Sequence, residues 1–324
     1  MSVRRAFPAN RITMVLDRLS GLVKEEFDHV AEYVNILEIG WGLPEVWKED
    51  ALASRIKYYQ KLGIKVSMSG TLIEHAIYLG SIEAMLRKAR KLGLDIIEIS
   101  DGIIDLSSDA RTKLAKTVKQ HDFDYLIAVG KKDPSAQLSL EETISQITNA
   151  LTLEPLRVVL EGRERGRSVG IYDDEGNIRW NILRSITSRL DPNDIIFEAP
   201  SEIQQAALIQ ELGPNVNLGN VSLASIAALE SERQGLRFDT FGIDRPHRHL
   251  SGGPSVKFVL FVIKENQPID QRQIVSMTHL PRRTVQKAVE YLVKNKLVTE
   301  HPNFSDRRSK IYRTQSAAPL WEKA

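Results

Sequence analysis

Short apolar runs alternate with amphipathic stretches along most of this chain. The runs are rich in Val, Ile and Leu, as buried strands are, and the segments between them are long enough for helices. Eight runs qualify as strands, at residues 11–17, 34–42, 65–68, 95–99, 125–129, 157–160, 194–197 and 216–218. The alternation predicts an α/β fold in which parallel strands are joined by helices.

Eight strands with helices between them, spread over about 250 residues, have the size and rhythm of a (β/α)8 TIM barrel. A doubly wound open sheet is the alternative, because it has the same order of elements. In either fold the functional groups gather at the carboxyl ends of the strands. The polar residues that follow each run are therefore the candidates for a site.

Two lysines directly follow one of the predicted strands. Residues 125–129 are apolar, and Gly130, Lys131 and Lys132 come immediately after them. This position predicts two cations at the rim of a parallel sheet, and so two site residues. The alternative is a pair of solvated surface lysines, since charge pairs usually mark exposed faces.

The other strand ends supply carboxylates, amides and hydroxyls. They are Asp17, Glu38, Ser69 with Thr71, Glu98 with Asp101, Glu161, Glu198, and Asn217 with Asn220. If a barrel closes, these groups converge on one rim. Carboxylates there would suit Mg²⁺, and the cations would suit an anionic substrate with phosphate or carboxylate groups. Taken singly, each acid could instead cap a helix or lie in a solvated loop.

Residues 162–170 interleave three arginines with three glycines after the sixth run. Backbone amides and guanidinium groups in such a segment can bind an oxyanion, so Arg163 and Arg165 are candidates for a phosphate-binding site. A flexible charged loop has the same composition and is the alternative.

The last 70 or so residues follow another pattern. An apolar helix at 256–263 precedes a second helix that Asp270 would cap, and a turn at 279–281 leads to a third. That third helix, 282–292, has Val285, Val289 and Leu292 at inward spacing. Two short strands, 297–300 and 310–313, would flank a wing at 304–309. The pattern predicts a winged helix-turn-helix domain.

Its DNA-contacting candidates are the outward residues of the third helix and the wing arginines: Arg282, Arg283, Thr284, Gln286, Lys287, Arg307 and Arg308. The helix would enter the major groove of double-stranded DNA, and the wing would contact phosphate or the minor groove. Two half-sites usually require a dimer, so we expect a homo-oligomer. Winged helices that serve only as protein-contact modules are the alternative.

Charge supports this division of the chain. Residues 251–324 contain 13 Lys or Arg against 6 Asp or Glu, whereas residues 1–250 contain 31 against 36. A basic tail on an acidic body is typical of an attached nucleic-acid module. The segment 245–254 is rich in Pro, Gly and His and has no apolar periodicity, as linkers do. We therefore expect a barrel at 1–244, a linker at 245–254 and a winged helix-turn-helix domain at 255–324.

Composition excludes some chemistry. The chain has no cysteine, which rules out disulfides, thiolate nucleophiles and cysteine-bound zinc. No apolar run approaches the roughly 20 residues that span a bilayer, and no signal-peptide pattern follows the first residues. These features favour a cytoplasmic protein.

Several strings of the first 242 residues together resemble the phosphosulfolactate synthase family. They are Gly40-Trp41-Gly42, Gly70-Thr71, Glu98-Ile99-Ser100-Asp101-Gly102, Val129-Gly130-Lys131-Lys132, Glu161-Gly162-Arg163-Glu164, Phe197-Glu198-Ala199-Pro200 with Gln204-Gln205, Asn217-Leu218 with Asn220, and Asp239-Thr240-Phe241-Gly242. The tail, over 254–315, resembles MarR-like winged-helix regulators of archaea and bacteria.

The resemblance implies a (β/α)8 barrel that adds sulfite to phosphoenolpyruvate, a Mg²⁺-dependent step of coenzyme M biosynthesis. Lys132, with Lys131 beside it, would be the catalytic acid. Asp101, Glu161 and Glu198 would hold the metal. The anionic substrate would meet Arg163, Arg165, Thr71, Asn217 and Asn220.

The chain departs from the family pattern inside the expected site. Glu38 stands where the family has lysine, Ala128 where it has an acid, and Ser69 where it has glycine. Two hypotheses follow. The barrel is a lyase-type enzyme with a DNA-binding tail, or it is the catalytically altered sensor of a transcriptional regulator that binds a phosphorylated or sulfonated acid.

Overall fold

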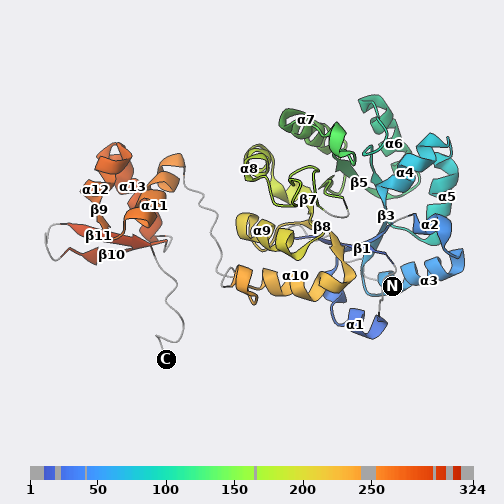
Figure 1. The fold of residues 1–324 in the computed structure, drawn as a ribbon, viewed down its shortest axis with the longest axis horizontal. Coiled ribbons are helices and arrows are strands. Elements are labelled where there is room, and N and C mark those ends of the chain that lie inside the picture. The colour runs from blue at the N-terminus through green and yellow to red at the C-terminus, as the bar shows by residue number, and fades with distance from the viewer. Residues whose placement is uncertain are drawn as a thin grey trace. The chain divides into compact units, whose positions relative to one another are not determined.

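A computed structural model of the chain describes residues 11–18, 23–40, 42–163, 166–241, 253–294, 297–303 and 309–314. The chain divides into two compact units, Met1–Arg245 and Pro246–Ala324 (Figure 1). The first carries the alternating strands and helices, and the described part of the second carries three helices and three short strands.

The strands of the first unit form one closed barrel in which each pairs in parallel with its neighbour, and β8 closes on β1. They are β1 Thr13–Asp17, β2 Ile36–Ile39, β3 Lys65–Met68, β4 Ile96–Ile99, β5 Asp124–Val129, β6 Val158–Leu160, β7 Ile195–Glu198 and β8 Leu218–Ser222. The predicted (β/α)8 fold is confirmed, and the open sheet is excluded.

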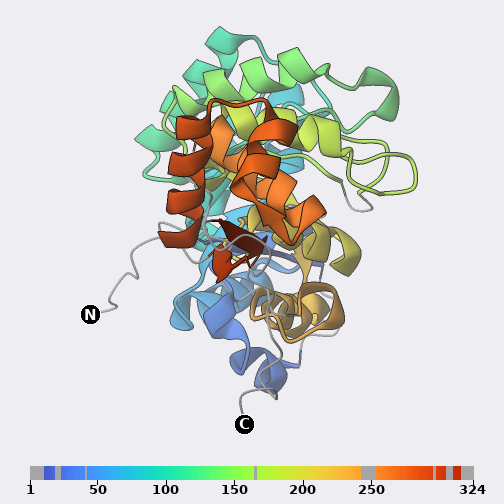
Figure 2. The ribbon, with the colours of Figure 1, turned by 90° about the vertical axis from the view of Figure 1, so that its left-hand side faces the viewer.

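Helices surround the barrel (Figures 1 and 2). They are α1 Lys24–Asp28, α2 Leu43–Val46, α3 Glu49–Lys61, α4 Gly70–Tyr78, α5 Ile82–Leu92, α6 Ser108–Gln120, α7 Leu140–Leu151, α8 Trp180–Arg189, α9 Glu202–Leu212 and α10 Ile226–Arg233. Short 3₁₀ turns are η1 Ala31–Tyr33, η2 Pro134–Ala136, η3 Pro192–Asp194, η4 Leu223–Ser225 and η5 Phe238–Thr240. Among the described helices of the chain, none is both long and apolar enough to cross a membrane.

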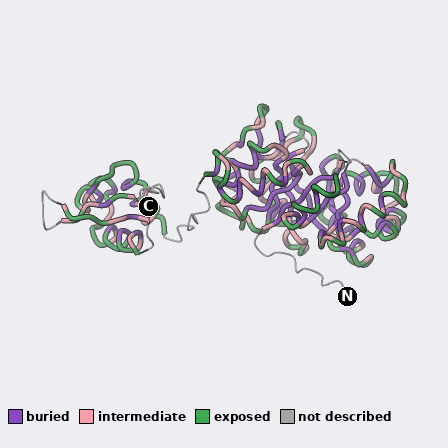
Figure 3. Tube along the Cα trace, turned by 90° about the horizontal axis from the view of Figure 1, so that it is seen from below, coloured by how far each residue is buried: buried purple, intermediate pink, exposed green. Residues whose placement is uncertain are grey.

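Two apolar clusters stabilise the barrel because the strands bury both faces. A large cluster lies between the strands and the helices, and a small one fills the interior. The interior cluster contains Ile12, Met14, Ile36, Ile96, Leu126, Ala128, Val159 and Ile196. Figure 3 shows this buried centre, with exposed residues along the outer helices.

The last strand lies further along the chain than the apolar run suggested, and this corrects the prediction for Asn217. Strand β8 begins at Leu218, where the predicted run ended. Asn217 therefore precedes the strand. Its side chain accepts a hydrogen bond from the Ile12 backbone N–H (2.8 Å) and donates to the carbonyl oxygens of Asn193 and Ile195. It ties strands together at their amino ends, at the opposite end of the barrel from the rim, so the prediction that it binds substrate is wrong.

The second unit is a winged helix-turn-helix domain, as predicted. Its helices are α11 Pro254–Asn266, α12 Gln271–Thr278 and α13 Arg282–Lys294. Its sheet has the order β10-β11-β9, with β9 Ile269–Asp270, β10 Val298–Pro302 and β11 Lys310–Thr314. Asp270 caps α12 in a reciprocal capping box with Gln273, a feature that stabilises a helix by about 1 kcal/mol. Arg307 and Arg308 of the predicted wing lie outside the described residues.

Candidate active site

Four glutamates form the upper layer of the barrel interior. Each follows an interior apolar residue by two positions, on a strand or directly after it: Glu38 after Ile36, Glu98 after Ile96, Glu161 after Val159 and Glu198 after Ile196. Because side chains alternate between the two faces of a strand, this spacing points all four carboxylates inward at the carboxyl ends. All four are buried, with 6–9% of their surface exposed.

These carboxylates line a cavity of about 460 Å³, large enough for a small phosphorylated acid. The lining residues come from both flanks of the barrel mouth: Leu16, Glu38, Gly40, Gly42, Glu45, Val46, Ser69, Thr71, Leu72, His75, Glu98, Lys132, Glu161, Arg163, Glu198 and Asn220. Among the described residues, its cations are Lys132 and Arg163, and its acids outnumber them.

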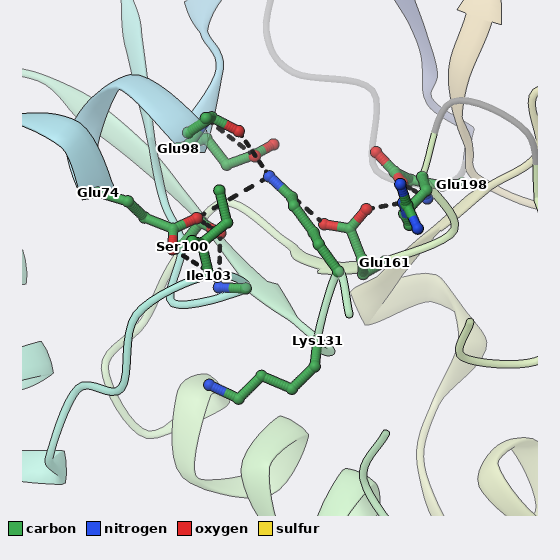
Figure 4. A network of polar contacts seen from close by, with 12 residues as sticks. Glu74, Glu98, Ser100, Ile103, Lys131, Glu161 and Glu198 are labelled. Carbon is green, nitrogen blue, oxygen red and sulfur yellow. Dashed lines mark hydrogen bonds and ion pairs between the residues drawn. The ribbon is translucent and has the colours of Figure 1, made fainter. Parts of the chain in front are cut away.

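Lys132 lies among the glutamates of this cavity. Its Nζ donates a hydrogen bond to Thr71 Oγ1 (2.7 Å) and lies 3.9 Å from Glu74 Oε1 and 3.9 Å from Glu161 Oε2. Figure 4 shows Glu74, Glu98 and Glu161 facing the same space, with Glu198 beyond Glu161. A protonated amine in this position can reach a ligand in the cavity.

Two glycines and the loop after β4 fix the backbone of Lys132. Gly130 has a φ of +130°, and a Cβ there would lie 2.7 Å from the Glu161 Cβ, so the turn after β5 requires glycine. The Lys132 N–H donates to the Gly102 carbonyl oxygen (2.9 Å). A Cβ on Gly102 would lie 3.1 Å from the Lys132 Cγ, so the lysine stem packs directly on that glycine.

Glu74 holds this loop in place. The side chain is 2% exposed, and one carboxylate oxygen accepts from the Ser100 hydroxyl (2.8 Å). The other oxygen accepts from the backbone N–H groups of Ile103 (2.7 Å) and Ile104 (3.0 Å). Helix α4 thereby fixes the loop on which Lys132 packs.

Glu161 and Glu198 anchor the segment that carries Arg163. The Arg163 N–H donates to Glu161 Oε1 (2.9 Å) and to Glu198 Oε2 (3.1 Å), and the Gly162 N–H donates to the same Glu198 oxygen (2.7 Å). Asn220 Nδ2 donates to the Arg163 carbonyl oxygen (2.8 Å). These bonds bring the arginine backbone to the cavity wall.

The cavity favours protonated carboxyl groups. Burial, followed by the negative charge of Glu38, raises the pKa of Glu98 well above its usual range. Burial also raises the pKa of Glu38 and Glu198, and for Glu198 the charge of Glu161 adds to it. Burial alone would lower the pKa of Lys132, but the surrounding glutamates, Glu161 foremost, raise it. Lys132 therefore carries a proton at neutral pH.

The structure brings six of the predicted site residues to this cavity: Lys132, Thr71, Arg163, Asn220, Glu161 and Glu198. They come from α4 and from the carboxyl ends of β5 to β8. Their roles stay predictions. Arg165 lies outside the described residues.

Two other predicted residues lie outside the cavity lining. Lys131 extends away from the glutamates (Figure 4), and its Nζ donates to the Asp101 and Ile104 carbonyl oxygens and to Asp105 Oδ1. The Asp101 carboxylate forms a buried ion pair with Arg111 of α6. In this arrangement Lys131 and Asp101 stabilise the loop after β4, and their predicted roles in catalysis and metal binding stay predictions.

Replacing Asp101 with asparagine is expected to lower the free energy of unfolding by about 3 kcal/mol, because the Arg111 guanidinium would stay buried without its counter-charge. Denaturant unfolding, followed through the transition of the barrel, measures this. Asp105→Asn is the matched control, since the Asp105 side chain is 97% exposed. Equal stability of Asp101→Asn and wild type would contradict a structural role for this pair.

The sequence analysis missed Glu74 and His75, and it included Glu38 and Glu98 among the strand-end carboxylates without naming them as metal ligands. The sequence does contain a pattern that indicates Glu38 and Glu98. On or directly after four of the strands, a glutamate comes two positions after an apolar residue, so both side chains point to the same face. The same spacing explains Asp17, which follows the inward Leu16 and faces outward. Asp17 accepts hydrogen bonds from Arg55 and from the Tyr59 hydroxyl (2.7 Å), so it fastens α3 to β1.

The cavity also fits a metal of the expected kind by its chemistry. Within the described ranges no three His, Cys, Asp or Glu side chains lie close enough to form a complete metal site. Mg²⁺ does not need one, because it often binds through one or two carboxylates, waters and substrate phosphates. The four interior glutamates offer only oxygen atoms, and an oxygen of Glu98 is buried without a hydrogen-bond partner.

The second unit presents the expected face of a DNA-reading helix. On α13, Val285, Ala288, Val289 and Leu292 are buried in the core of the unit. Arg282, Arg283, Gln286 and Lys287 are exposed, and Thr284 is half-buried. The positive side chains therefore lie on the free face of the helix.

A closed (β/α)8 barrel with a cavity at the carboxyl ends of its strands, lined by lysine, arginine and carboxylates, has the architecture of a TIM-barrel enzyme, whose active site lies at that end. A family model described as (2R)-phospho-3-sulfolactate synthase (ComA) matches residues 7–239. The chain belongs to the phosphosulfolactate synthase family. A model of the MarR family matches residues 254–309.

Three phosphosulfolactate synthases align with the barrel. The protein of Methanocaldococcus jannaschii is 38% identical over 237 residues, which are 71% of this chain and 94% of that protein. The protein of Methanothermobacter thermautotrophicus is 35% identical over 237 residues, 72% of this chain and 92% of its own. The protein of Bacillus subtilis is 31% identical over 221 residues, which are 67% of this chain and 86% of that protein. These alignments use nearly all of each relative, so the winged-helix unit is an addition to the part that they share.

Proposed function

We propose that the barrel catalyses the Mg²⁺-dependent addition of sulfite, or a related nucleophile, to phosphoenolpyruvate. The observation that carries this proposal is Lys132, a protonated amine held among glutamates at the cavity, in a chain of this family. The relatives named phosphosulfolactate synthase supply the reaction type.

In the proposed step, the sulfur lone pair attacks the methylene carbon of phosphoenolpyruvate and forms the carbon–sulfur bond. The electron pair of the double bond moves to the carbon that bears the phosphate, and the negative charge spreads into the carboxylate. Lys132 Nζ then gives a proton to that carbon, and the amine regains a proton from solvent.

Cationic and hydrogen-bonding groups of the cavity would bind the anion. Arg163 and Asn220 lie at one flank, and Thr71 lies beside Lys132. Of the residues predicted to hold magnesium, Glu161 and Glu198 line the cavity. A magnesium ion bound in the cavity would stabilise the negative charge that develops on the carboxylate.

The test is sulfite-dependent consumption of phosphoenolpyruvate by the purified full chain. We expect turnover with Mg²⁺ and its loss after removal of the metal with EDTA, restored by added Mg²⁺. A wild-type protein that binds phosphoenolpyruvate but consumes none with any nucleophile would contradict an enzymatic barrel.

Glu38 favours a second candidate function, in which the barrel is a sensor. Its carboxylate is buried at the cavity where the family pattern has a lysine, a change of two charge units. Such a barrel would bind a phosphorylated or sulfonated acid and alter DNA binding. Gel-shift titrations with these acids test it.

We propose that the second unit binds double-stranded DNA through α13, as a homo-oligomer that holds two half-sites. Replacing Arg283 and Lys287 together with alanine is expected to weaken DNA binding about tenfold or more and to reduce its salt dependence, because both phosphate-binding charges are exposed on the helix. Fluorescence anisotropy at several salt concentrations measures this. Lys294→Ala, at the far end of the same helix, is the matched control. Unchanged affinity in the double variant would contradict the assignment.

A further inference from the structure

One sector of the cavity, between β2 and β4, is lined by side-chain oxygen atoms that have no role in the proposed reaction. Glu38 lies on β2, Ser69 follows β3, and Glu98 lies on β4. Ser67 lies on β3 between them and pairs with Glu38 across the strands. Val66 and Met68 pack toward the helices, so Ser67 points to the interior.

One carboxylate oxygen of this sector, and the Ser67 hydroxyl outside the cavity lining, are buried without a partner. Glu98 is 6% exposed, and its Oε1 accepts from the Gly70 N–H (3.1 Å), but its Oε2 has no hydrogen bond. The Ser67 hydroxyl is fully buried and also has none. A buried polar atom without a partner destabilises the fold, and a bound ligand or ion can recover that loss.

Glu38 and Glu98 are in none of the close ion pairs between described residues. Burial raises the pKa of both carboxyl groups, and a hydrogen bond from the Ser69 hydroxyl to Glu38 and the charge of Lys132 lower it only in part. The other two interior glutamates are better satisfied. Glu161 lies 3.9 Å from Lys132 Nζ, and Glu198 accepts two backbone N–H groups.

Neighbouring bonds hold the oxygens in place. Helix α4 starts at Gly70, where a Cβ would lie 2.4 Å from the Ser100 Cβ and 2.8 Å from Glu98 Oε1, so only glycine allows the N–H to reach Glu98. Ser69 is the residue directly before this helix. The two carboxylates are therefore fixed by hydrogen bonds from adjacent backbone and hydroxyl groups, as preformed ligands are.

We propose that Glu38, Glu98 and Ser69 bind a hard divalent cation of the Mg²⁺ class. Two carboxylates and a hydroxyl leave coordination positions for waters and for a substrate phosphate, which is how Mg²⁺ is usually held. The inference moves the metal from Asp101, Glu161 and Glu198 to the β2–β4 side of the cavity. The inference rests on the proposed function only in taking this cavity as the active site. Binding of the cation itself requires no substrate, so it can be measured separately.

The test is titration of the full chain with Mg²⁺ alone and with Mn²⁺ alone, by calorimetry and, for Mn²⁺, by electron paramagnetic resonance. Wild type is expected to bind one ion. Glu38→Gln and Glu98→Gln are each expected to weaken binding about tenfold or more. Both changes keep the side-chain shape and remove a repulsive buried charge, so we expect both variants to fold. Glu45→Gln is the matched control, because Glu45 lines the same cavity at its exposed rim and pairs with Lys88.

Three results would overturn the inference: no binding by wild type, binding unchanged in Glu38→Gln, or an equal loss in Glu45→Gln. The first would mean that the carboxyl groups hold protons in place of a cation. Failure of the proposed function looks different. Turnover of phosphoenolpyruvate without ion binding at this sector would preserve the function and reject the inference. If the protein consumes no phosphoenolpyruvate but binds an ion, and Glu38→Gln abolishes that binding, the inference is kept and the proposed function is rejected.

Discussion

Replacing Lys132 with alanine is expected to lower turnover about 10³-fold, because it removes the proposed proton donor. The ammonium group lies in the cavity, bonded to Thr71 and close to Glu74 and Glu161. A step that forms a carbanion without a nearby acid must take its proton from water. Steady-state assays with phosphoenolpyruvate and sulfite measure the loss, and circular dichroism checks the fold.

Lys131→Ala is the control that makes this result specific. The two lysines are adjacent in sequence, but Lys131 bonds to the loop after β4 and lies outside the cavity lining. We expect Lys131→Ala to keep most of its turnover and to lose some thermal stability. Equal losses in the two variants would mean that the loop, and not the Lys132 proton, limits the reaction. Unchanged turnover in Lys132→Ala would remove the residue from the mechanism.

The split between these neighbours also shows where sequence reasoning stops. Alternation along a strand predicts which side chains point inward, and it separates Leu16 from Asp17 and places Glu38 and Glu98. Lys131 and Lys132 come after β5 has ended, so the two-residue alternation of a strand does not predict the directions of their side chains. Their directions depend on contacts with Gly102 and the loop after β4, which are distant in sequence.

The fold was predictable because every level of the pattern agreed: apolar runs, intervening amphipathic segments and polar strand ends. Asn217 shows the remaining error, since a shift of a few residues in one strand moved its side chain from the rim to the opposite end. Glu74 shows a different one. It lies inside a helix, and nothing in the sequence near it indicates that its carboxylate binds Ser100 and two backbone amides of another segment.

The winged-helix unit was predictable for another reason. Its elements are local, and its core depends on the helical spacing of residues such as Val285, Val289 and Leu292. Its DNA-contacting residues follow from the same periodicity, because whatever is not buried on α13 is exposed. No such periodicity predicts the barrel site, since its groups come from the ends of all eight strands and from α2 and α4.

Glu38→Lys is the second change with a large expected effect. It removes a proposed cation ligand and puts an ammonium group beside Glu98, where the cation would bind. Because the two positive charges exclude each other, we expect the variant to lose Mg²⁺ binding and to lower Mg²⁺-dependent turnover by roughly 10²-fold or more, since a bound metal contributes several kcal/mol to such a step. Calorimetry and the phosphoenolpyruvate assay measure both effects, and Glu45→Lys makes the same charge change at the rim, where we expect little effect.

The opposite outcome would decide between the two functions of the barrel. If wild type were inactive with sulfite and Glu38→Lys gained turnover, then Lys132, Arg163 and the interior glutamates would form a complete site that the acid at residue 38 alone prevents from reacting. An anionic nucleophile must enter a cavity whose acids already outnumber its cations, and the variant shifts that balance by two charges. Such a result would make the natural chain a sensor, and the ligands to test next would be phosphorylated acids that change DNA binding by α13.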